Sequence, residues 1–436
     1  MTAPQLSMKE LRRVVTAAAV GNVIEWYDFY IFGSLAAILA VKFFAEGGSG
    51  TGLIRTVGTF TAGFLIRPFG ALLFGRIGDL VGRKYTFVVT LSGMGLSTAL
   101  IGVVPSYAQI GALAGVLLLG LRLIQGLCLG GEYGGAITYV AEHAPDEKRG
   151  YYTGWLQTSP TLGIIVSLAV IIATREIVGD TAWTAWGWRI PFLMSLLMVA
   201  IAIYIRLQLQ ETPIFQAIKA KGQTTTSPWR EAFLSQNIKY VLIACVVVIG
   251  EGVVWYSGQF WALYFLQQVR KPDTLSPAII TGIALLIATP SLVFFGWLSD
   301  RIGRKPIILA GFVCAAATYY PLYTALGKAA DPANTNWVLA VLIVAIMVTY
   351  VGMVYGPIGA FLAEYFPARI RYTSVSVPYH VGNGWGGGLV PVITTAAYLH
   401  SGLSSALVYP IAVPTAAFIL GLLLMPETKH IKIWDS

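Results

Sequence analysis

Twelve apolar stretches, each long enough to cross a lipid bilayer, constrain this chain of 436 residues more than any other feature. A membrane-spanning helix needs about 17 to 25 such residues, and only backbone that satisfies its own hydrogen bonds is stable in hydrocarbon. Charged residues make up 11% of the chain, whereas soluble domains contain roughly 25%. The sequence therefore predicts an all-α integral membrane protein. The stretches lie at 14–41, 53–75, 86–104, 109–141, 152–173, 186–208, 240–266, 275–298, 307–326, 337–363, 373–399 and 403–425.

Short charged phrases recur half a chain apart. "GRIGDLVGRKY" at 75–85 returns as "GWLSDRIGRKP" at 296–306, and "YVAEHAPDEKRGYYTG" at 139–154 returns as "LAEYFPARIRYTS" at 362–374. Each half holds six stretches, an even number, so both halves enter the membrane from the same side as parallel repeats. The matching residues are Glu142 with Glu364, Pro145 with Pro367 and Arg149 with Arg371.

This repeat predicts three parts of the chain. Residues 1–209 form a six-helix bundle, 210–239 a cytoplasmic linker, and 240–436 a second six-helix bundle. The net charge of +9 gathers in the loops on the side of the two termini, which places both termini in the cytoplasm by the positive-inside rule. The basic charge thus sets the orientation in the membrane, and we expect no nucleic-acid partner.

Six ionisable side chains fall inside the apolar stretches. Each costs about 2.5 to 3.5 kcal/mol at the bilayer centre on insertion scales. Such residues are tolerable only in pairs or facing a water-filled cavity, which is typical of a substrate or proton path. The competing interpretation is a structural ion pair. These residues are Glu25, Asp28, Arg67, Arg122, Glu132 and Glu251.

Glu25 and Asp28 are the best candidates for carrying a proton. They lie three residues apart on one helical face, and two partly desolvated carboxyl groups do not both stay ionised. Arg122 precedes Gly126 and Gly130, whose spacing places both glycines on one face where a neighbouring helix packs closely. Arg67 either attracts a substrate or fixes helix packing.

Aromatic and polar side chains of the first, seventh and eleventh stretches are candidates for lining a central site. The alternative for the aromatic residues is packing. His380 either titrates near neutral pH or is a hydrogen-bonded core group. The candidates are Trp26, Tyr27, Trp255, Tyr256, Gln259, Tyr264, Tyr379, His380 and Asn383, together with Glu251.

The paired loops resemble the signature loops of the major facilitator superfamily, over nearly the whole chain. Four further stretches are similar to the metabolite:H⁺ symporter family, which takes up organic acids, shikimate-like compounds, or proline and betaine. They read "GNVIEWYDFYIFG" at 21–33, "FLIRPFGALLFGRIGD" at 64–79, "RLIQGLCLGGEYGG" at 122–135 and "VPYHVGNGWGGG" at 377–388.

The resemblance implies the major facilitator fold, with twelve helices in two pseudo-symmetric bundles, in the inner (plasma) membrane of a bacterium. It also links Arg122 to proton coupling, for which Glu25, Asp28 and Glu132 are the acidic candidates. The resemblance further implies an inner gate that is closed in the outward-facing state. The gate residues are Asp79, Arg83, Glu142 and Arg149, repeated as Asp300, Arg304, Glu364 and Arg371.

We therefore expect a monomeric, proton-coupled symporter that imports a small organic acid by alternating access, with Arg122 and Arg67 attracting the carboxylate. One alternative is a symporter of zwitterions such as proline or betaine, since a Trp and Tyr cage with acidic residues suits a quaternary ammonium. Another is a channel or an uncoupled uniporter. No nucleotide loop, metal-ligand cluster or nucleophile–base pair stands out, so we expect no enzyme, metal or cofactor. The expected partners are substrate, protons and lipid.

Overall fold

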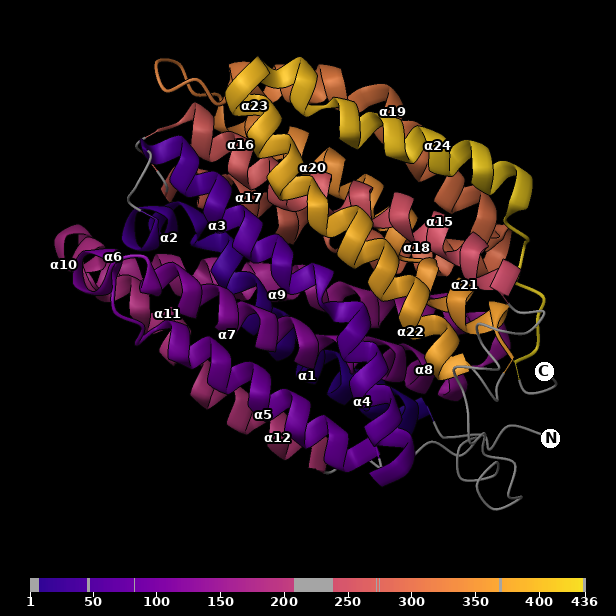
Figure 1. Ribbon diagram of the computed structural model, residues 1–436. Coiled ribbons are helices and arrows are strands. Elements are labelled where there is room, and N and C mark those ends of the chain that lie inside the picture. Colours follow the sequence, from indigo (N-terminus) through magenta and orange to yellow (C-terminus); the bar gives the residue numbers. More distant parts are fainter. Residues whose placement is uncertain are drawn as a thin grey trace.

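The computed structural model describes residues 8–44, 48–81, 83–207, 238–271, 273, 275–367 and 371–433. Within these ranges the chain is helical, without a strand. Long helices run side by side between two ends of the molecule, and the indigo-to-magenta half lies beside the orange-to-yellow half (Figure 1). The end at which α1 begins and α24 ends is called the terminal end here, and the other the opposite end.

The first half contains the helices of the first six predicted spans. Its first span is bent by 58° between α1 and α2. In chain order the elements are α1 (Met8–Ser34), α2 (Ala36–Phe43), α3 (Gly48–Leu65), α4 (Arg67–Val81), α5 (Arg83–Ile101), α6 (Tyr107–Ile110), α7 (Leu113–Gly130), α8 (Tyr133–His143), α9 (Arg149–Val178), α10 (Asp180–Ala185), α11 (Ile190–Leu193) and α12 (Ser195–Leu207).

The second half repeats this plan and adds two π-helical segments, η3 and η4. The elements are α15 (Ile238–Tyr256), η3 (Ser257–Trp261), α16 (Ala262–Val269), α17 (Leu275–Ala288), α18 (Pro290–Ile302), α19 (Arg304–Ala329), α20 (Trp337–Tyr355), α21 (Ile358–Tyr365), α22 (Arg371–Val381), η4 (Gly382–Gly386), η5 (Gly387–Leu389), α23 (Val390–Ala406) and α24 (Val408–Leu424).

Each of the twelve predicted stretches coincides with one of these helical spans, so the twelve-helix prediction is confirmed. Span 2 breaks beside Pro68 and span 8 beside Pro290, because proline lacks the N–H that a helix interior requires. Gly402, with a φ of 81°, separates spans 11 and 12. The predicted linker falls almost wholly on residues 208–237, which lie outside the described residues.

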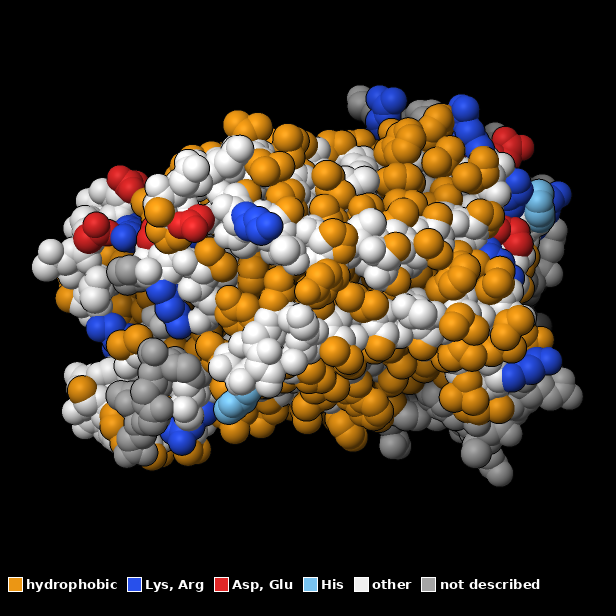
Figure 2. All heavy atoms as spheres, turned by 90° about the horizontal axis from the view of Figure 1, so that it is seen from above, with side chains coloured by type: hydrophobic (Ala, Val, Ile, Leu, Met, Phe, Trp, Pro, Cys, Tyr) orange, Lys and Arg blue, Asp and Glu red, His pale blue; other side chains and the backbone are white. Residues whose placement is uncertain are grey.

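The surface has the distribution of side chains that a bilayer demands. Hydrophobic side chains cover the middle of the face shown in Figure 2, and its charged side chains gather towards the two ends. Among the described residues, eight helices are long and apolar enough to span a membrane alone, and two further bent pairs pass together.

Glycines hold the helices of the first half close together. A Cβ added to Gly126 of α7 would lie 2.0 Å from the backbone oxygen of Gly63, and one added to Gly130 would lie 2.1 Å from that of Arg67. The predicted glycine face therefore packs directly on the backbone of α3 and α4. This contact brings the helices that carry Arg67 and Arg122 together.

Candidate functional site

An aromatic layer joins the two halves near the middle of the molecule. The Tyr30 ring of α1 stacks on Trp26 of the same helix at 4.9 Å between centroids, and on Trp255 of α15 at 5.5 Å. The Tyr30 and Tyr256 hydroxyl groups lie 3.4 Å apart. Phe260 of η3 packs 4.9 Å from the Tyr30 ring. The contact between spans 1 and 7 is therefore built from buried aromatic rings.

Arg67 is fully buried against this layer. Its guanidinium carbon lies 5.2 Å from the Trp26 ring, 5.3 Å from Phe64 and 5.9 Å from Tyr379 of α22. Its three side-chain nitrogens make no well-formed hydrogen bond among the described residues, although the Tyr379 hydroxyl is close enough to interact with the guanidinium. A buried guanidinium needs hydrogen-bond acceptors as well as an opposite charge to offset its desolvation. The guanidinium is therefore suited to bind an anion.

Glu251 contributes the opposite charge from the second half. It is fully buried in α15, and its Oε2 accepts a hydrogen bond of 2.9 Å from the Asn383 side-chain nitrogen. Its Oε1 has no hydrogen-bond partner in the described part of the chain. Asn383 lies in the π-helix η4, and such segments are frequent at functional sites. Arg67 is the positive charge that interacts electrostatically with Glu251.

Further buried polar groups surround the layer without partners in the described ranges. They include the indole nitrogens of Trp26 and Trp255, both amide atoms of Gln259, and both ring nitrogens of His380. Gln259 lies in the other π-helix, η3. The Tyr264 hydroxyl instead donates to the Gly33 carbonyl at 3.1 Å. The site is thus rich in unused donors enclosed by aromatic rings.

A second aromatic layer, formed by Tyr133, Gln157, Tyr355 and Tyr379, connects four helices. Tyr133 of α8 stacks on Tyr379 of α22 at 3.3 Å. The Tyr133 hydroxyl donates to Gln157 Oε1 at 3.0 Å, Gln157 donates to the Tyr355 carbonyl at 3.1 Å, and the Tyr355 and Tyr379 hydroxyls lie 2.9 Å apart. Sequence reasoning missed three of these residues. The only signal was that Tyr133 follows Glu132 inside a family-like stretch.

Arg122 lies within the first half, beside the same aromatic side chains. One terminal nitrogen donates to the Phe29 carbonyl at 3.0 Å and to Gln125 Oε1 at 2.8 Å. Its guanidinium carbon is 3.7 Å from the Phe29 ring and 4.6 Å from the Phe60 ring. Its Nε and other terminal nitrogen lack partners among the described residues. Arg122 is therefore partly satisfied, whereas Arg67 is not.

The acidic residues of span 1 face the interior of the first half. Asp28 lies beside Glu25 and Ser195 of α12, and its carbonyl accepts from Thr98 of α5 at 3.4 Å. Tyr27 of α1 is directed into the first half in this structure, where its hydroxyl donates to the Pro191 carbonyl at 2.6 Å.

Glu132, the remaining acidic candidate, is buried at the junction of α7 and α8, where it interacts electrostatically with Cys128. The structure therefore places it, like Asp28, within the first half.

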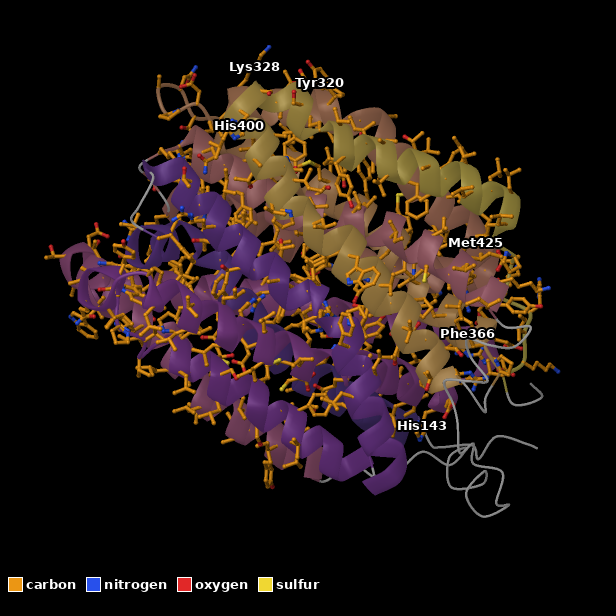
Figure 3. The ribbon with its side chains drawn as sticks, viewed as in Figure 1. His143, Tyr320, Lys328, Phe366, His400 and Met425 are labelled. Carbon is orange, nitrogen blue, oxygen red and sulfur yellow. The ribbon has the colours of Figure 1, made fainter. Side chains whose placement is uncertain are left out.

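At the terminal end, charged pairs cross between the halves. Arg149 of the first half binds Glu364 of the second at 2.9 Å, and Arg371 of the second half binds Glu142 of the first at 3.1 Å. All four side chains are at most 5% exposed. His143, Phe366 and Met425 mark this end in Figure 3, and Lys328 and His400 mark the opposite end.

The repeated loop reinforces this closure in its second copy. Asp300 accepts hydrogen bonds of 2.8 Å from the backbone nitrogens of Gly150 and Tyr151 at the start of α9, and binds Arg304 at 2.7 Å. Arg304 also binds Glu364 at 2.9 Å. In the first copy, the side chains of Asp79 and Arg83 lie outside the described residues.

The opposite end is nearly closed as well. A small cavity remains between the halves there, lined by Ser34, Leu168, Trp183 and Gln267 among others. The Thr61 hydroxyl of α3 donates to the Gly388 carbonyl at 2.7 Å across the halves. The central site is therefore enclosed from both ends in this structure.

Comparison of the sequence with known proteins identifies the family of this chain. A model of the "Sugar (and other) transporter" family matches residues 14–227 and again 221–434. The inner membrane metabolite transport protein YhjE of Escherichia coli is 30% identical over 96% of this chain and 94% of its own. The ectoine/proline transporter ProP of Corynebacterium glutamicum is 32% identical over 97% and 85%. The proline/betaine transporter of Escherichia coli is 32% identical over 85% and 75%.

Solved structures give the same fold. The proton:xylose symporter XylE bound to 6-bromo-6-deoxy-D-glucose superposes with a TM-score of 0.75, at 18% identity and over 97% of each chain. The partially occluded, inward-open xylose transporter XylE from Escherichia coli gives 0.73, at 20% identity, over 97% of this chain and 99% of its own. The chain belongs to the sugar (and other) transporter family, and its fold is that of the major facilitator superfamily symporter XylE.

Proposed function

We propose that this protein is a proton-coupled symporter of a small zwitterion that bears a carboxylate and a substituted ammonium, such as proline or glycine betaine. The observation that carries the proposal is the buried guanidinium of Arg67, which makes no well-formed hydrogen bond among the described residues and lies against the rings of Trp26, Phe64 and Tyr379. Arg67 binds the substrate carboxylate through charge-assisted hydrogen bonds.

The rings of Tyr30, Trp255, Tyr256 and Phe260, called the aromatic box here, suit the cationic part of the same substrate. Tyr30, Trp255, Tyr256 and Phe260 lie within 4.8 to 5.9 Å of one another in the pairs Tyr30–Trp255, Trp255–Tyr256 and Tyr256–Phe260. Ring faces attract a quaternary or secondary ammonium. Relatives named as proline, betaine and ectoine transporters support this substrate class. The initial expectation of an organic acid thereby becomes the second candidate.

One observation favours that second candidate. Arg122 has two more nitrogens without a hydrogen-bond partner among the described residues, lies over the Phe29 ring that Arg67 also approaches at 5.8 Å, and interacts electrostatically with Arg67. Two guanidinium groups suit a dicarboxylate better than a solute with one carboxylate. Uptake of succinate in preference to proline would support this alternative.

The proposal also covers the location of the protein, its orientation in the membrane and its inner gate. We place the protein as a monomer in a bacterial inner membrane, with the terminal end in the cytoplasm. The charged pairs there form the inner gate, and the two halves rock around the central site. A thiol reagent that cannot cross the membrane, applied from the outside to single cysteines placed at either end, would test this orientation. We expect it to label the opposite end and not the terminal end.

The test uses protein reconstituted in liposomes that enclose a pH-sensitive dye. Proline, glycine betaine, succinate, citrate and an aromatic acid are added in turn, and we expect the interior to acidify with proline or betaine. Arg67→Gln should weaken substrate binding at least 100-fold, since it removes two charge-assisted hydrogen bonds of about 1.5 to 3 kcal/mol each. Arg301→Gln, an exposed arginine over Trp297, is the matched control. Entry of labelled solute without acidification would leave a uniporter.

A further inference from the structure

Glu251 and Arg67 are opposite charges that the two halves bring to one enclosed site. Both side chains are fully buried. The three side-chain nitrogens of Arg67, which lies beside Tyr379, and one oxygen of Glu251 make no well-formed hydrogen bond among the described residues. Because Asn383 holds Oε2 at 2.9 Å, the free Oε1 is the atom at which a proton can bind. Neither group is locked into a fixed ion pair, so the partner of Arg67 can change.

The surroundings of Glu251 contain no second carboxyl group that would share its proton in the described part of the chain. Arg67 of α4 is the one cation that interacts with it electrostatically. The neighbouring phenols interact with it electrostatically as well, and His380 interacts with Arg67. Asn383 of η4 contacts Glu251 directly, and the other groups that interact with it electrostatically are Arg67 of α4, Tyr133 of α8, Tyr355 of α20, Tyr379 of α22 and Tyr256 of α15.

The acidic residues of span 1 occupy a different position. Asp28 packs beside Glu25 and Ser195 in the interior of the first half. The groups that act most strongly on Asp28 are Ser195 and Glu25, whereas Arg67 is the charged group that acts on Glu251. A proton on Glu251 therefore acts directly on the charge that binds substrate.

We propose that Glu251 carries the coupled proton, and that its carboxylate and the carboxylate of the substrate alternate on Arg67. This inference rests on the proposed function, because it takes Arg67 as the substrate-binding cation. When Glu251 is ionised it neutralises Arg67 and opposes substrate binding. When a proton binds Oε1, Arg67 is released and the substrate carboxylate takes its place.

Coupling follows from this exchange. Substrate favours the protonated site and the proton favours substrate binding by the same factor, since linkage is reciprocal. Opening at the terminal end lets the substrate leave, after which Glu251 loses its proton to water on that side and pairs again with Arg67. The empty, neutral pair can then return to the other orientation without carrying charge.

The test compares wild type with Glu251→Gln, which keeps the hydrogen bond to Asn383 but cannot ionise. Proline and glycine betaine are the probes, and binding is followed by intrinsic tryptophan fluorescence. For wild type we expect the dissociation constant to rise about tenfold per pH unit above the pH at which Glu251 ionises, as one linked proton requires. For E251Q we expect a flat profile, with solute exchange retained and acidification of the liposome lost.

Two further variants make the outcome specific. Glu176→Gln removes an exposed carboxylate of α9 and should leave both the pH profile and acidification unchanged. Asn383→Ala removes the hydrogen bond to Oε2 and should shift the midpoint of the pH profile, which keeps the proposal testable if E251Q does not fold.

Acidification by E251Q at the wild-type rate would overturn the inference and leave the proposed symport intact. So would loss of coupling in Asp28→Asn while E251Q still couples. Absence of acidification in wild type with every probe would refute the symport and the inference together.

Discussion

Neutralising Glu364 should open the terminal end. Glu364 accepts hydrogen bonds from Arg149 at 2.9 Å, from Arg304 at 2.9 and 3.2 Å, and from Thr428 at 2.7 Å. Arg304 and Thr428 belong to the same half as Glu364, so those bonds are weakened equally in the closed and open states. The bond to Arg149 exists only when the halves are closed at this end.

The size of the effect follows from that single bond. A hydrogen bond to a charged group contributes about 1.5 to 3 kcal/mol, and each 1.4 kcal/mol changes an equilibrium about tenfold. Glu364→Gln should therefore shift the population towards the form open at the terminal end by about 10- to 150-fold. A protein with roughly 1% of that form would then hold it at about 10 to 60%.

The shift can be measured as a distance between spin labels. Glu147 and Ile302 are exposed at the terminal end in opposite halves, and each is replaced by labelled cysteine after Cys128, Cys245 and Cys314 are changed to serine. We expect one short distance in the parent and a second, longer one in the Glu364→Gln variant.

Two comparisons decide whether the reasoning holds. Arg149→Gln should give at least as large a shift, because it also removes the hydrogen bond of 3.3 Å to the Ile431 carbonyl of the second half. The double variant should add little to Arg149→Gln, because the bond between Arg149 and Glu364 is shared by both changes. Asp273→Asn, at the opposite end, is the control and should leave the distances unchanged. An unaltered distribution in E364Q, or fully additive effects in the double variant, would refute this account of the closure.

Three further outcomes follow from the geometry. Gly130→Val should lower the melting temperature in detergent or prevent folding, because a Cβ at this position would lie 2.1 Å from a backbone oxygen of α4. Gly282→Ala is the control and should be tolerated, because the atom nearest to its added Cβ would lie 3.9 Å away. Thr61→Val with Trp385→Phe removes two bonds, of 2.7 and 3.1 Å, that join spans 2 and 11 across the halves. Spin labels at the opposite end should then show more opening, and an unchanged distance would contradict a role of these bonds in closing that end. Burial raises the pKa of Asp273, but hydrogen bonds from Ser276, Leu275 and Arg270 outweigh this effect and lower the pKa below its ordinary value. Asp273→Asn should therefore lower the melting temperature at pH 7. The difference in melting temperature between wild type and variant should shrink as the pH falls through the lowered pKa.

The architecture was predictable because the membrane imposes it. The length of the apolar stretches predicted the twelve helices, whereas the breaks beside Pro68, Pro290 and Gly402 were not predicted and are seen only in the structure. The glycine spacing after Arg122 also correctly indicated close helix packing. These features depend on local composition and helical periodicity, which a single sequence displays directly.

The site was less predictable because helix rotation decides which side chains meet. Tyr27 follows Trp26 in the sequence, yet it points into the first half while Trp26 faces Arg67. Tyr133 joins the second aromatic layer only because α8 and α22 are packed together in the fold. Gln259 and Asn383 lie in π-helices, which change the helical register locally. The sequences of these segments contain no signal that predicts a π-helix.

The crosswise pairs at the terminal end have a consequence for assembly. Each half contributes one acid and one base in the same order, Glu142 and Arg149 or Glu364 and Arg371, and each acid binds the base of the other half. Such a contact is unchanged when the two halves are exchanged, which is the property of an isologous interface between identical subunits. A single six-helix unit with these two residues would already be complementary to a copy of itself. Joining the halves in one chain then raises the effective concentration of each half for the other. The two acid–base pairs determine which surfaces of the halves bind each other.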